Sequence, residues 1–218
     1  MIVTFCAYDG RGQVNGPNIW LRRLLPQLRA RGIDARVLLL LTAPPTECAT
    51  LRALEAAGVP CRATPWPDST WARVRWLLGE LRATRPAVFV PNVMVPAYYA
   101  ARWARAAGIA TVGVLHSDDA FHHALVERFV AGAPRDRLNA LVCVSRELET
   151  LARAAGGEVG TQITRIAYGV PVPNTMASAP TSELRLLYVG RLVEAQKRAS
   201  DVARALCQAA CELPGVTA

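Results

Sequence analysis

Short apolar runs alternate with amphipathic helical runs along most of this chain, and this alternation is the feature that most limits its fold. Several of the apolar runs are continuously hydrophobic, as in strands that are covered on both faces of a sheet. Repeated strand–helix units predict an α/β protein with a doubly wound parallel sheet. The predicted strands are Ile2–Ala7, Ala35–Leu41, Val59–Thr64, Ala87–Pro91, Thr111–Leu115, Ala140–Val144 and Ile163–Ala167.

Helical runs separate these strands. Gly32, Gly58 and Gly108 each follow one of them, where a left-handed residue commonly ends a helix. A hydrophobic content of 52% and a charged content of 19% describe a globular protein with a sizeable core. The predicted helices are Pro17–Arg31, Glu47–Ala57, Thr70–Arg85, Pro96–Ala107, Asp119–Ala131 and Arg146–Ala155.

The alternation is interrupted once, at residues 169–182. This stretch is rich in proline and small polar residues, which predicts an interdomain linker. We therefore expect a Rossmann-like domain over residues 1–168 and the start of a second such domain over residues 183–218. One strand and one helix cannot bury enough apolar surface to be stable alone, so this second segment should be mobile or pack against the first domain.

The charge balance and the cysteines limit the partners and the compartment. The formal net charge is +8, but no zinc-finger or RNP pattern is present, so nucleic acid is not a predicted partner. The positive charge is compatible with two other classes of partner, anionic small ligands and an anionic membrane surface. Six cysteines without a C-x-x-C pair, no signal peptide and no apolar run of roughly 18–20 residues predict a cytoplasmic protein with reduced thiols. The inner face of the membrane is an alternative location.

The predicted helix Thr70–Arg85 is basic and carries two tryptophans. Trp76 lies near Arg73; we expect it to be partly covered, and contact with a membrane interface is the alternative. The opposite face is expected to pack in the core and consists of Trp71, Val74, Leu77, Leu78 and Leu81.

Ligands of open parallel sheets bind at the carboxyl ends of the strands. Three glycines follow the first strand within seven residues, ending at Gly16, and Pro17 suits the first turn of the next helix. We favour a loop that approaches a phosphate or sugar over an ordinary flexible loop, with Asn15 and Asn18 as candidate contacts. The spacing is neither G-x-G-x-x-G nor a P-loop, and no acidic residue ends the second strand, which counts against a dinucleotide cofactor.

Polar residues also follow three later strands. Asn92 can bind a hydroxyl-rich ligand or belong to an ordinary helix turn, and both interpretations stay open. His116 is directed into the cleft by its strand end, where it can donate to a substrate oxygen or take part in proton transfer. His122 and His123 follow closely, but the spacing H-x-x-x-x-x-H-H is not a familiar ligand pattern, so no metal is predicted. Ser145 fits the N-cap of the next helix and places free N–H groups at the cleft edge.

The last segment carries a candidate anion site. A predicted strand, Leu186–Val189, runs into Gly190; Arg191 follows, and Lys197 comes six positions later at a predicted helix start. Glycine lets the backbone approach a ligand, and a helix N-terminus offers unpaired N–H groups. Together with the two positive charges, these features predict a clamp for a diphosphate.

Taken in order, these segments resemble a family 4 retaining glycosyltransferase of the GT-B fold. The ordered set covers essentially the whole chain, and Gly190-Arg191 with Lys197 is its most specific part. The residues that carry the resemblance are Gly16-Pro17-Asn18, Gly113–His116, Val144-Ser145, Tyr168–Pro171 and Tyr188–Leu192 with Lys197.

The resemblance implies two Rossmann-like domains, with a nucleotide-sugar donor on the C-terminal one and a sugar or lipid-linked acceptor on the N-terminal one. The candidates on the acceptor side are then Asn15, Asn18, Asn92 and Ser145. It implies that Arg191 and Lys197 neutralise the donor diphosphate and stabilise the leaving group. It also implies that the loop around Gly16 approaches the same region and that His116 lies near the transferred sugar. Neither a protein nucleophile nor a metal is implied.

The family's paired glutamates lie farther along the second domain than this chain extends. We therefore expect a partial chain that lacks much of the donor site and is inactive alone. The leading interpretation is the acceptor-side part of a hexosyltransferase. The alternatives are a non-catalytic sugar- or nucleotide-binding remnant and a GT-B sugar-nucleotide epimerase; the Gly190-Arg191 pair with Lys197 favours the transferase.

Overall fold

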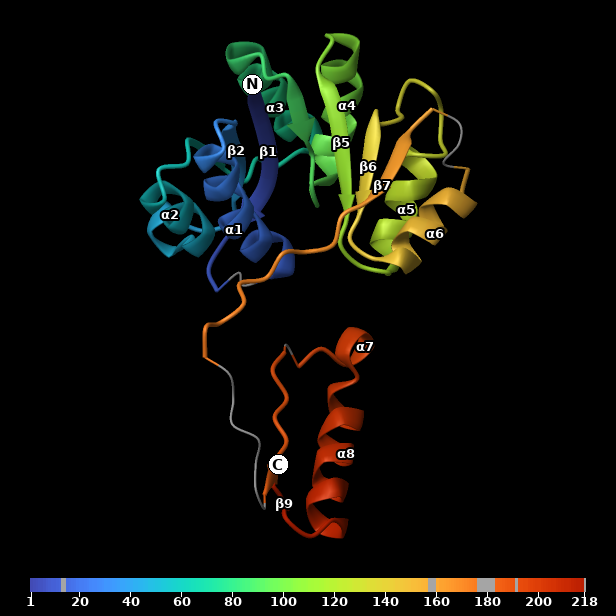
Figure 1. Cartoon of the computed structure of the whole chain (residues 1–218). Helices are drawn as coiled ribbons and strands as arrows, with labels where there is room; N and C mark the ends of the chain where they lie inside the picture. The colour runs from blue at the N-terminus through green and yellow to red at the C-terminus, as the bar shows by residue number, and fades with distance from the viewer. Residues whose placement is uncertain (13–14, 157–159, 176–182, 191, 218) are drawn as a thin grey trace. The chain divides into compact units, whose positions relative to one another are not determined.

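The computed structural model describes residues 1–12, 15–156, 160–175, 183–190 and 192–217. The chain divides into two compact units, Met1–Gly169 and Val170–Ala218 (Figure 1). No helix in the described ranges is both long and apolar enough to cross a membrane.

The first unit contains a seven-stranded sheet in the order β3-β2-β1-β4-β5-β6-β7. All neighbouring strands are parallel, which confirms the predicted doubly wound α/β sheet. The order reverses direction between β1 and β4, and it is at the carboxyl ends of the strands beside such a switch point that open α/β sheets form their ligand crevice. The strands are β1 (Ile2–Asp9), β2 (Asp34–Leu41), β3 (Cys61–Pro65), β4 (Val88–Val90), β5 (Ala110–Leu115), β6 (Ala140–Cys143) and β7 (Gln162–Arg165).

The helices lie between the strands as the sequence predicts, with shifted ends. Gly32, Gly58 and Gly108 have positive φ angles of 80°, 69° and 82°, which confirms their place at helix ends. The predicted helix Glu47–Ala57 is divided into a short 3₁₀ turn and α2. The helical elements of this unit are α1 (Gly16–Ala30), η1 (Pro45–Glu47), α2 (Ala49–Ala56), α3 (Thr70–Thr84), α4 (Val95–Ala106), α5 (Ala120–Phe129) and α6 (Arg146–Ala154).

Both faces of the central strands are buried, which explains why the strands are continuously apolar. In β1, Phe5 and Ala7 pack with α1 and α2, whereas Cys6 between them packs with α3 and α4. Burial raises the pKa of the Cys6 thiol far above its ordinary value, so it behaves as a small apolar side chain. A third cluster joins α5 and α6 to β6 and β7.

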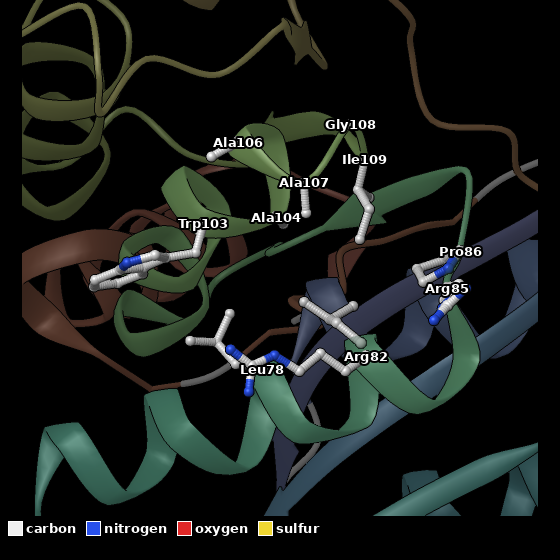
Figure 2. Close-up of a pocket in the computed structure, with 11 residues that line it drawn as sticks. Leu78, Arg82, Arg85, Pro86, Trp103, Ala104, Ala106, Ala107, Gly108 and Ile109 are labelled. Atoms are coloured by element: carbon white, nitrogen blue, oxygen red, sulfur yellow. The ribbon is translucent and has the colours of Figure 1, made fainter.

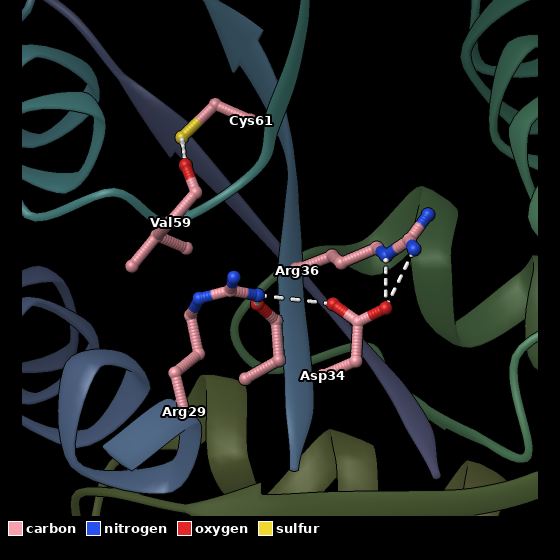
Figure 3. Close-up of polar contacts among 6 residues, drawn as sticks. Arg29, Asp34, Arg36, Val59 and Cys61 are labelled. Carbon is pink, nitrogen blue, oxygen red and sulfur yellow. Dashed lines mark hydrogen bonds and ion pairs between the residues drawn. The ribbon is translucent and has the colours of Figure 1, made fainter. Parts of the chain in front are cut away.

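Ion pairs fix the end of α1 against the amino end of β2. Asp34 accepts hydrogen bonds from Arg29 of α1 at 3.0 Å and from Arg36 of β2 at 2.6 Å (Figure 3). The pair with Arg36 is the main reason that the pKa of Asp34 lies below its ordinary value.

The prediction for α3 is wrong at Trp71. Val74, Leu77 and Leu81 are buried as expected, but Trp71 is 64% exposed. It lies in the first turn of α3, before the first buried residue, and its ring packs edge-on against Trp103 of α4 at 5.9 Å.

The second unit contains a two-stranded parallel sheet of β8 (Leu184–Arg185) and β9 (Val216–Thr217), with the helices α7 (Glu194–Lys197) and α8 (Ala199–Glu212). The predicted strand Leu186–Val189 is wrong, because β9 offers only two residues for pairing. The position expected for Lys197 is also wrong: it ends α7, and Arg198 with φ 49° separates it from α8. None of the described side chains of this unit is buried.

Candidate functional site

Asp9 anchors the loop after β1. Its side chain is fully buried, and its carboxylate accepts hydrogen bonds from the N–H groups of Gly10 at 3.0 Å, Thr50 at 2.8 Å and Leu51 at 2.9 Å. Arg11 forms an ion pair with Glu47 at 2.5 Å. The described part of this loop, up to Gly12, is therefore tied to the start of α2 through Asp9 and to η1 through Arg11.

The start of α1 positions three residues that the sequence singles out. Asn15 is the N-cap and accepts from the Asn18 N–H at 2.9 Å. Asn18 is buried, and its side chain donates to the Tyr8 carbonyl at 3.1 Å, which ties α1 to β1. Gly16 is exposed, and a Cβ there would meet nothing within 4 Å, so open space lies beside this turn. Both asparagines thus have structural roles at the crevice, and their role toward an acceptor stays a prediction.

The centre of the site is a chain of three hydrogen-bonded side chains. His116 follows the end of β5; its Nε2 lies 2.6 Å from Oδ1 of Asn92, and its Nδ1 pairs with the hydroxyl of Tyr168. Asn92 follows β4 and is fully buried, with a left-handed φ of 52°. The structure thus brings together two predicted residues and adds Tyr168.

Aromatic rings surround His116. Its ring is stacked on Tyr168, with 5.9 Å between centroids and 15° between planes, and Trp20 of α1 lies edge-on at 5.2 Å. Burial, with a smaller contribution from His122, lowers the pKa of His116 to about 3. Burial also raises the pKa of Tyr168 to about 12. Both groups are therefore neutral near pH 7.

The three histidines have different hydrogen-bond partners, although the rings of His116 and His122 lie edge-on with 6.3 Å between their centroids. His122 is buried and its Nδ1 lies 2.8 Å from Oδ1 of Asp119, whereas His123 lies 2.6 Å from Asp118. Asp119 is the N-cap of α5 and accepts a hydrogen bond from the His122 N–H at 3.0 Å. Within the described ranges, no three His, Cys, Asp or Glu residues form a group that could hold a metal ion.

The remaining predicted residues lie at helix ends or in the second unit. Ser145 is the N-cap of α6, as predicted, and accepts from the Leu148 N–H at 3.3 Å. Gly190 cannot carry a side chain without movement, since a Cβ would lie 2.6 Å from the Tyr188 hydroxyl. Lys197 is exposed, and Arg191 lies outside the described residues. The diphosphate clamp therefore stays a prediction.

Among the hollows of the first unit, two that lie apart from the Asn92–His116–Tyr168 chain are described next. An apolar hollow of about 410 Å³ lies beside Trp20 and is lined by valines of β4, β5 and β6. A groove of about 770 Å³ lies between the carboxyl ends of α3 and α4 (Figure 2). Arg82 and Arg85 line it from α3 and Trp103 from α4, over an apolar floor that includes Leu81 and Ile109.

Tyr168 and Trp20 were not predicted as site residues. Tyr168 belongs to the Tyr-Gly-Val-Pro stretch, which was used only for the family resemblance. Trp20 lies on a helix whose apolar positions indicate only a buried face. The contacts of both residues join segments that are far apart in the sequence, so local patterns do not show them.

A model of glycosyltransferase family 4 matches residues 14–172, which include Asn92, His116 and Tyr168. No curated protein sequence matches the chain significantly.

Several solved structures share the fold at low sequence identity. A lipopolysaccharide outer core galactosyltransferase, WaaB, superimposes with a TM-score of 0.69 at 14% identity, over 95% of this chain and 58% of its own. The glycotransferase of kitacinnamycin gives 0.54 at 18% identity, over 99% and 64%. UDP-GlcNAc 2-epimerase from Neisseria meningitidis gives 0.51 at 12% identity, over 75% and 46%. The chain thus spans less than two thirds of each of these proteins.

Proposed function

The chain belongs to glycosyltransferase family 4, and from this premise we propose that it takes part in sugar transfer from a nucleotide-sugar donor to an acceptor hydroxyl. The first unit binds the acceptor, and its crevice at the carboxyl ends of β1, β4 and β5 is where an open α/β sheet binds ligands. One observation carries the proposal: the Asn92–His116–Tyr168 chain lies at these strand ends and inside the family match. Neutral, hydrogen-bonding side chains beside aromatic rings suit a polyhydroxyl ligand.

The donor that we propose is a uridine nucleotide sugar, held through its diphosphate by Arg191 and Lys197. Two structures of similar fold carry such ligands: Anabaena Alr3699/HepE, at 19% identity, is in complex with UDP, and the Neisseria epimerase is bound to UDP-GlcNAc. Two side-chain cations can balance the diphosphate charge as it develops, so the proposed reaction uses no metal and no other cofactor.

We further propose that the protein is cytoplasmic and touches the inner face of the membrane through α3 and α4. The guanidinium groups of Arg82 and Arg85 have no ion pair or hydrogen bond with the residues that the structure describes. The exposed ring of Trp71 and the partly buried ring of Trp103 lie on the same pair of helices. Arginine and tryptophan together favour an anionic lipid–water interface, where a lipid-linked acceptor would be found.

An epimerase is the second candidate, because structures of UDP-GlcNAc 2-epimerases share the fold. The two activities differ in their products. A transferase releases the nucleoside diphosphate and leaves the sugar on an acceptor or on water, whereas a 2-epimerase inverts carbon 2 of the sugar.

The direct test uses an enzyme that contains this chain together with a complete donor-binding domain. It is incubated with a panel of UDP- and GDP-sugars, with a membrane extract as the source of acceptors. Release of the nucleoside diphosphate, lost in His116→Ala and kept in His123→Ala, supports the proposal. His123 is a matched control, because it is a histidine of the neighbouring helix α5 and its hydrogen-bond partner is the exposed Asp118. A change of sugar configuration without release assigns an epimerase, and neither binding nor release of any donor refutes both.

A further inference from the structure

The hydrogen bonds of His116 define which of its nitrogens carries the proton. Oδ1 of Asn92 can only accept, so the Nε2 that lies 2.6 Å away must donate. A neutral imidazole has a single N–H, which leaves Nδ1 as an acceptor. The Tyr168 hydroxyl at Nδ1 is therefore the donor of the second hydrogen bond.

The two partners of His116 differ in exposure. Asn92 is fully buried, whereas Tyr168 is 39% exposed. The Nε2 side of the ring thus faces the interior of the first unit, and the Nδ1 side faces a residue at its surface. A ligand that reaches the ring must come from the Nδ1 side, where it meets Tyr168.

Tyr168 is also the more easily displaced partner. It lies three residues after the end of β7 and one residue before the end of the first unit. Asn92 is held between β4 and α4, and asparagine is one of the few residue types that accept its left-handed backbone.

From this arrangement we propose that Asn92 is a positioning residue which fixes His116 as the Nε2–H tautomer, and that Tyr168 occupies the Nδ1 position which a sugar hydroxyl takes on binding. The inference rests on the proposed function and adds a direction to it: His116 accepts a hydrogen bond from the ligand and does not donate one. A hydroxyl of the sugar can replace the Tyr168 hydroxyl as the donor to Nδ1, so the imidazole of His116 makes the same number of hydrogen bonds before and after binding.

A second feature of Asn92 makes the orientation of its carboxamide testable. Its Nδ2 is buried and has no hydrogen-bond partner within the described ranges. Turning the carboxamide by half a turn would pair Nδ2 with His116 and would reverse every donor in the chain, with Nδ1–H then donating to Tyr168. The two arrangements predict opposite tautomers of His116, so the tautomer is the decisive observable.

The test uses protein labelled with ¹⁵N in histidine and long-range ¹H–¹⁵N correlation near pH 7, without any sugar. We expect the Nε2–H tautomer in the wild type and in Tyr168→Phe, and a mixture of tautomers in Asn92→Leu. The Nδ1–H tautomer in the wild type would overturn the proposal, even if the Asn92 variant failed to fold.

The second arm measures how far Tyr168 covers Nδ1. Diethyl pyrocarbonate attacks an unprotonated imidazole nitrogen, and peptide mapping separates His116 from His122 and His123. Loss of one hydrogen bond predicts a modification of His116 that is about fivefold to tenfold faster in Tyr168→Phe. Tyr99→Phe, which changes another partly exposed tyrosine that packs on Phe129, should leave the rate unchanged.

An unchanged rate in Tyr168→Phe would overturn the covering role of Tyr168. Neither arm depends on a nucleotide sugar or on turnover. A failure here therefore leaves the transferase proposal standing, and a failure of every donor assay leaves the tautomer result intact.

Discussion

His116 illustrates how burial at one residue changes the chemistry available to it. An exposed histidine is partly protonated near pH 6.5, but the pKa of His116 is lowered to about 3, so its ring stays neutral across the physiological range. In a neutral imidazole one nitrogen donates a hydrogen bond and the other accepts one. His116 can therefore be held by the Asn92 carboxamide at Nε2 while Nδ1 binds a hydroxyl. In the Asn92–His116–Tyr168 chain, His116 and Asn92 were predicted as site residues because they follow strand ends. Tyr168 also follows a strand end, but only the fold shows that its hydroxyl lies at Nδ1 of His116.

The same shift makes stability depend on pH. In the unfolded chain His116 has a pKa near 6.5, and in the folded chain it has a pKa of about 3. Below pH 6.5 the unfolded state binds a proton that the folded state does not, so stability falls as the pH drops from about 6.5 toward 3. We expect this residue to lower the free energy of unfolding by up to about 1.4 kcal/mol per pH unit in that window.

Urea unfolding between about pH 7 and 5 checks this expectation. His116→Gln should flatten the pH dependence, whereas His123→Gln, at an exposed position, should leave it as in the wild type. Identical slopes for the wild type and His116→Gln would mean that the imidazole is not held neutral.

The prediction for the donor diphosphate site concerns Lys197. If it stabilises the leaving diphosphate, Lys197→Ala should reduce the turnover of a full-length enzyme that contains this chain about 10²–10³-fold, the effect of losing one preorganised charge. Arg204 of α8 offers a control of equal charge, since it is exposed and pairs with Asp201. Arg204→Ala should keep turnover within about threefold of the wild type. Unchanged turnover in Lys197→Ala, with the circular dichroism spectrum unchanged, would exclude the clamp.

At the scale of elements, the sequence predicted all seven strands of the first unit, including β3 and β7, whose residues are mostly exposed, but it misplaced one residue of α3 and one strand of the second unit. The central strands were found from their apolar runs, since a run such as Leu38–Leu41 indicates a strand that is covered on both faces. Trp71 was wrongly predicted to be buried, because the apolar face of a helix does not show how far along that helix the neighbouring helix covers it. The strand at Leu186–Val189 was overestimated, because its length depends on pairing with residues near Val216, which no local pattern reports.

Asp9 should be the strongest single anchor between elements at the site. Its carboxylate binds three backbone N–H groups in a fully buried place, and each would be left unpaired in Asp9→Ala. An unpaired buried donor costs about 1–3 kcal/mol, so we expect a loss of about 3 kcal/mol or more in the free energy of unfolding. Asp118→Ala, which removes an exposed carboxylate, should change it by less than about 0.5 kcal/mol. Chemical denaturation of both variants is the measurement, and a loss below about 1 kcal/mol in Asp9→Ala would contradict this account.

The groove between α3 and α4 gives a prediction about the membrane. Each arginine near an anionic surface contributes about 1 kcal/mol, so replacing Arg82 and Arg85 with alanine should weaken binding to phosphatidylserine-containing vesicles about thirtyfold. Replacing Arg22 and Arg23 of α1 removes the same charge from another exposed surface and should have a much smaller effect. Vesicle co-sedimentation at low and high salt measures both. Equal losses in the two double variants would show that net charge alone, and not this groove, governs binding.

At the scale of the whole molecule, the two units differ in how much of their chain is buried. The first unit contains three buried clusters on the faces of one sheet. The second has four residues in strands and no buried side chain in its described part, and Leu187, Val189 and Leu192 are each more than 80% exposed. Hydrophobic burial is the main source of folding free energy, so the second unit has little to hold it together by itself.

Hydrogen exchange should separate the two units clearly. In the second unit, the amides of Leu184 and Leu186 donate to Gly215 and Thr217 across a sheet of only two strands. Opening such a sheet costs little, so we expect these amides to exchange within about a hundredfold of the rate of an unstructured peptide. The amide of Leu39, in the middle of the buried strand β2, should exchange only on global unfolding and therefore several orders of magnitude more slowly. If Leu184 and Leu186 were protected as strongly as Leu39 in the monomeric protein, contacts beyond those within the second unit would have to supply the difference, and the weak stability that we infer for this unit would be wrong.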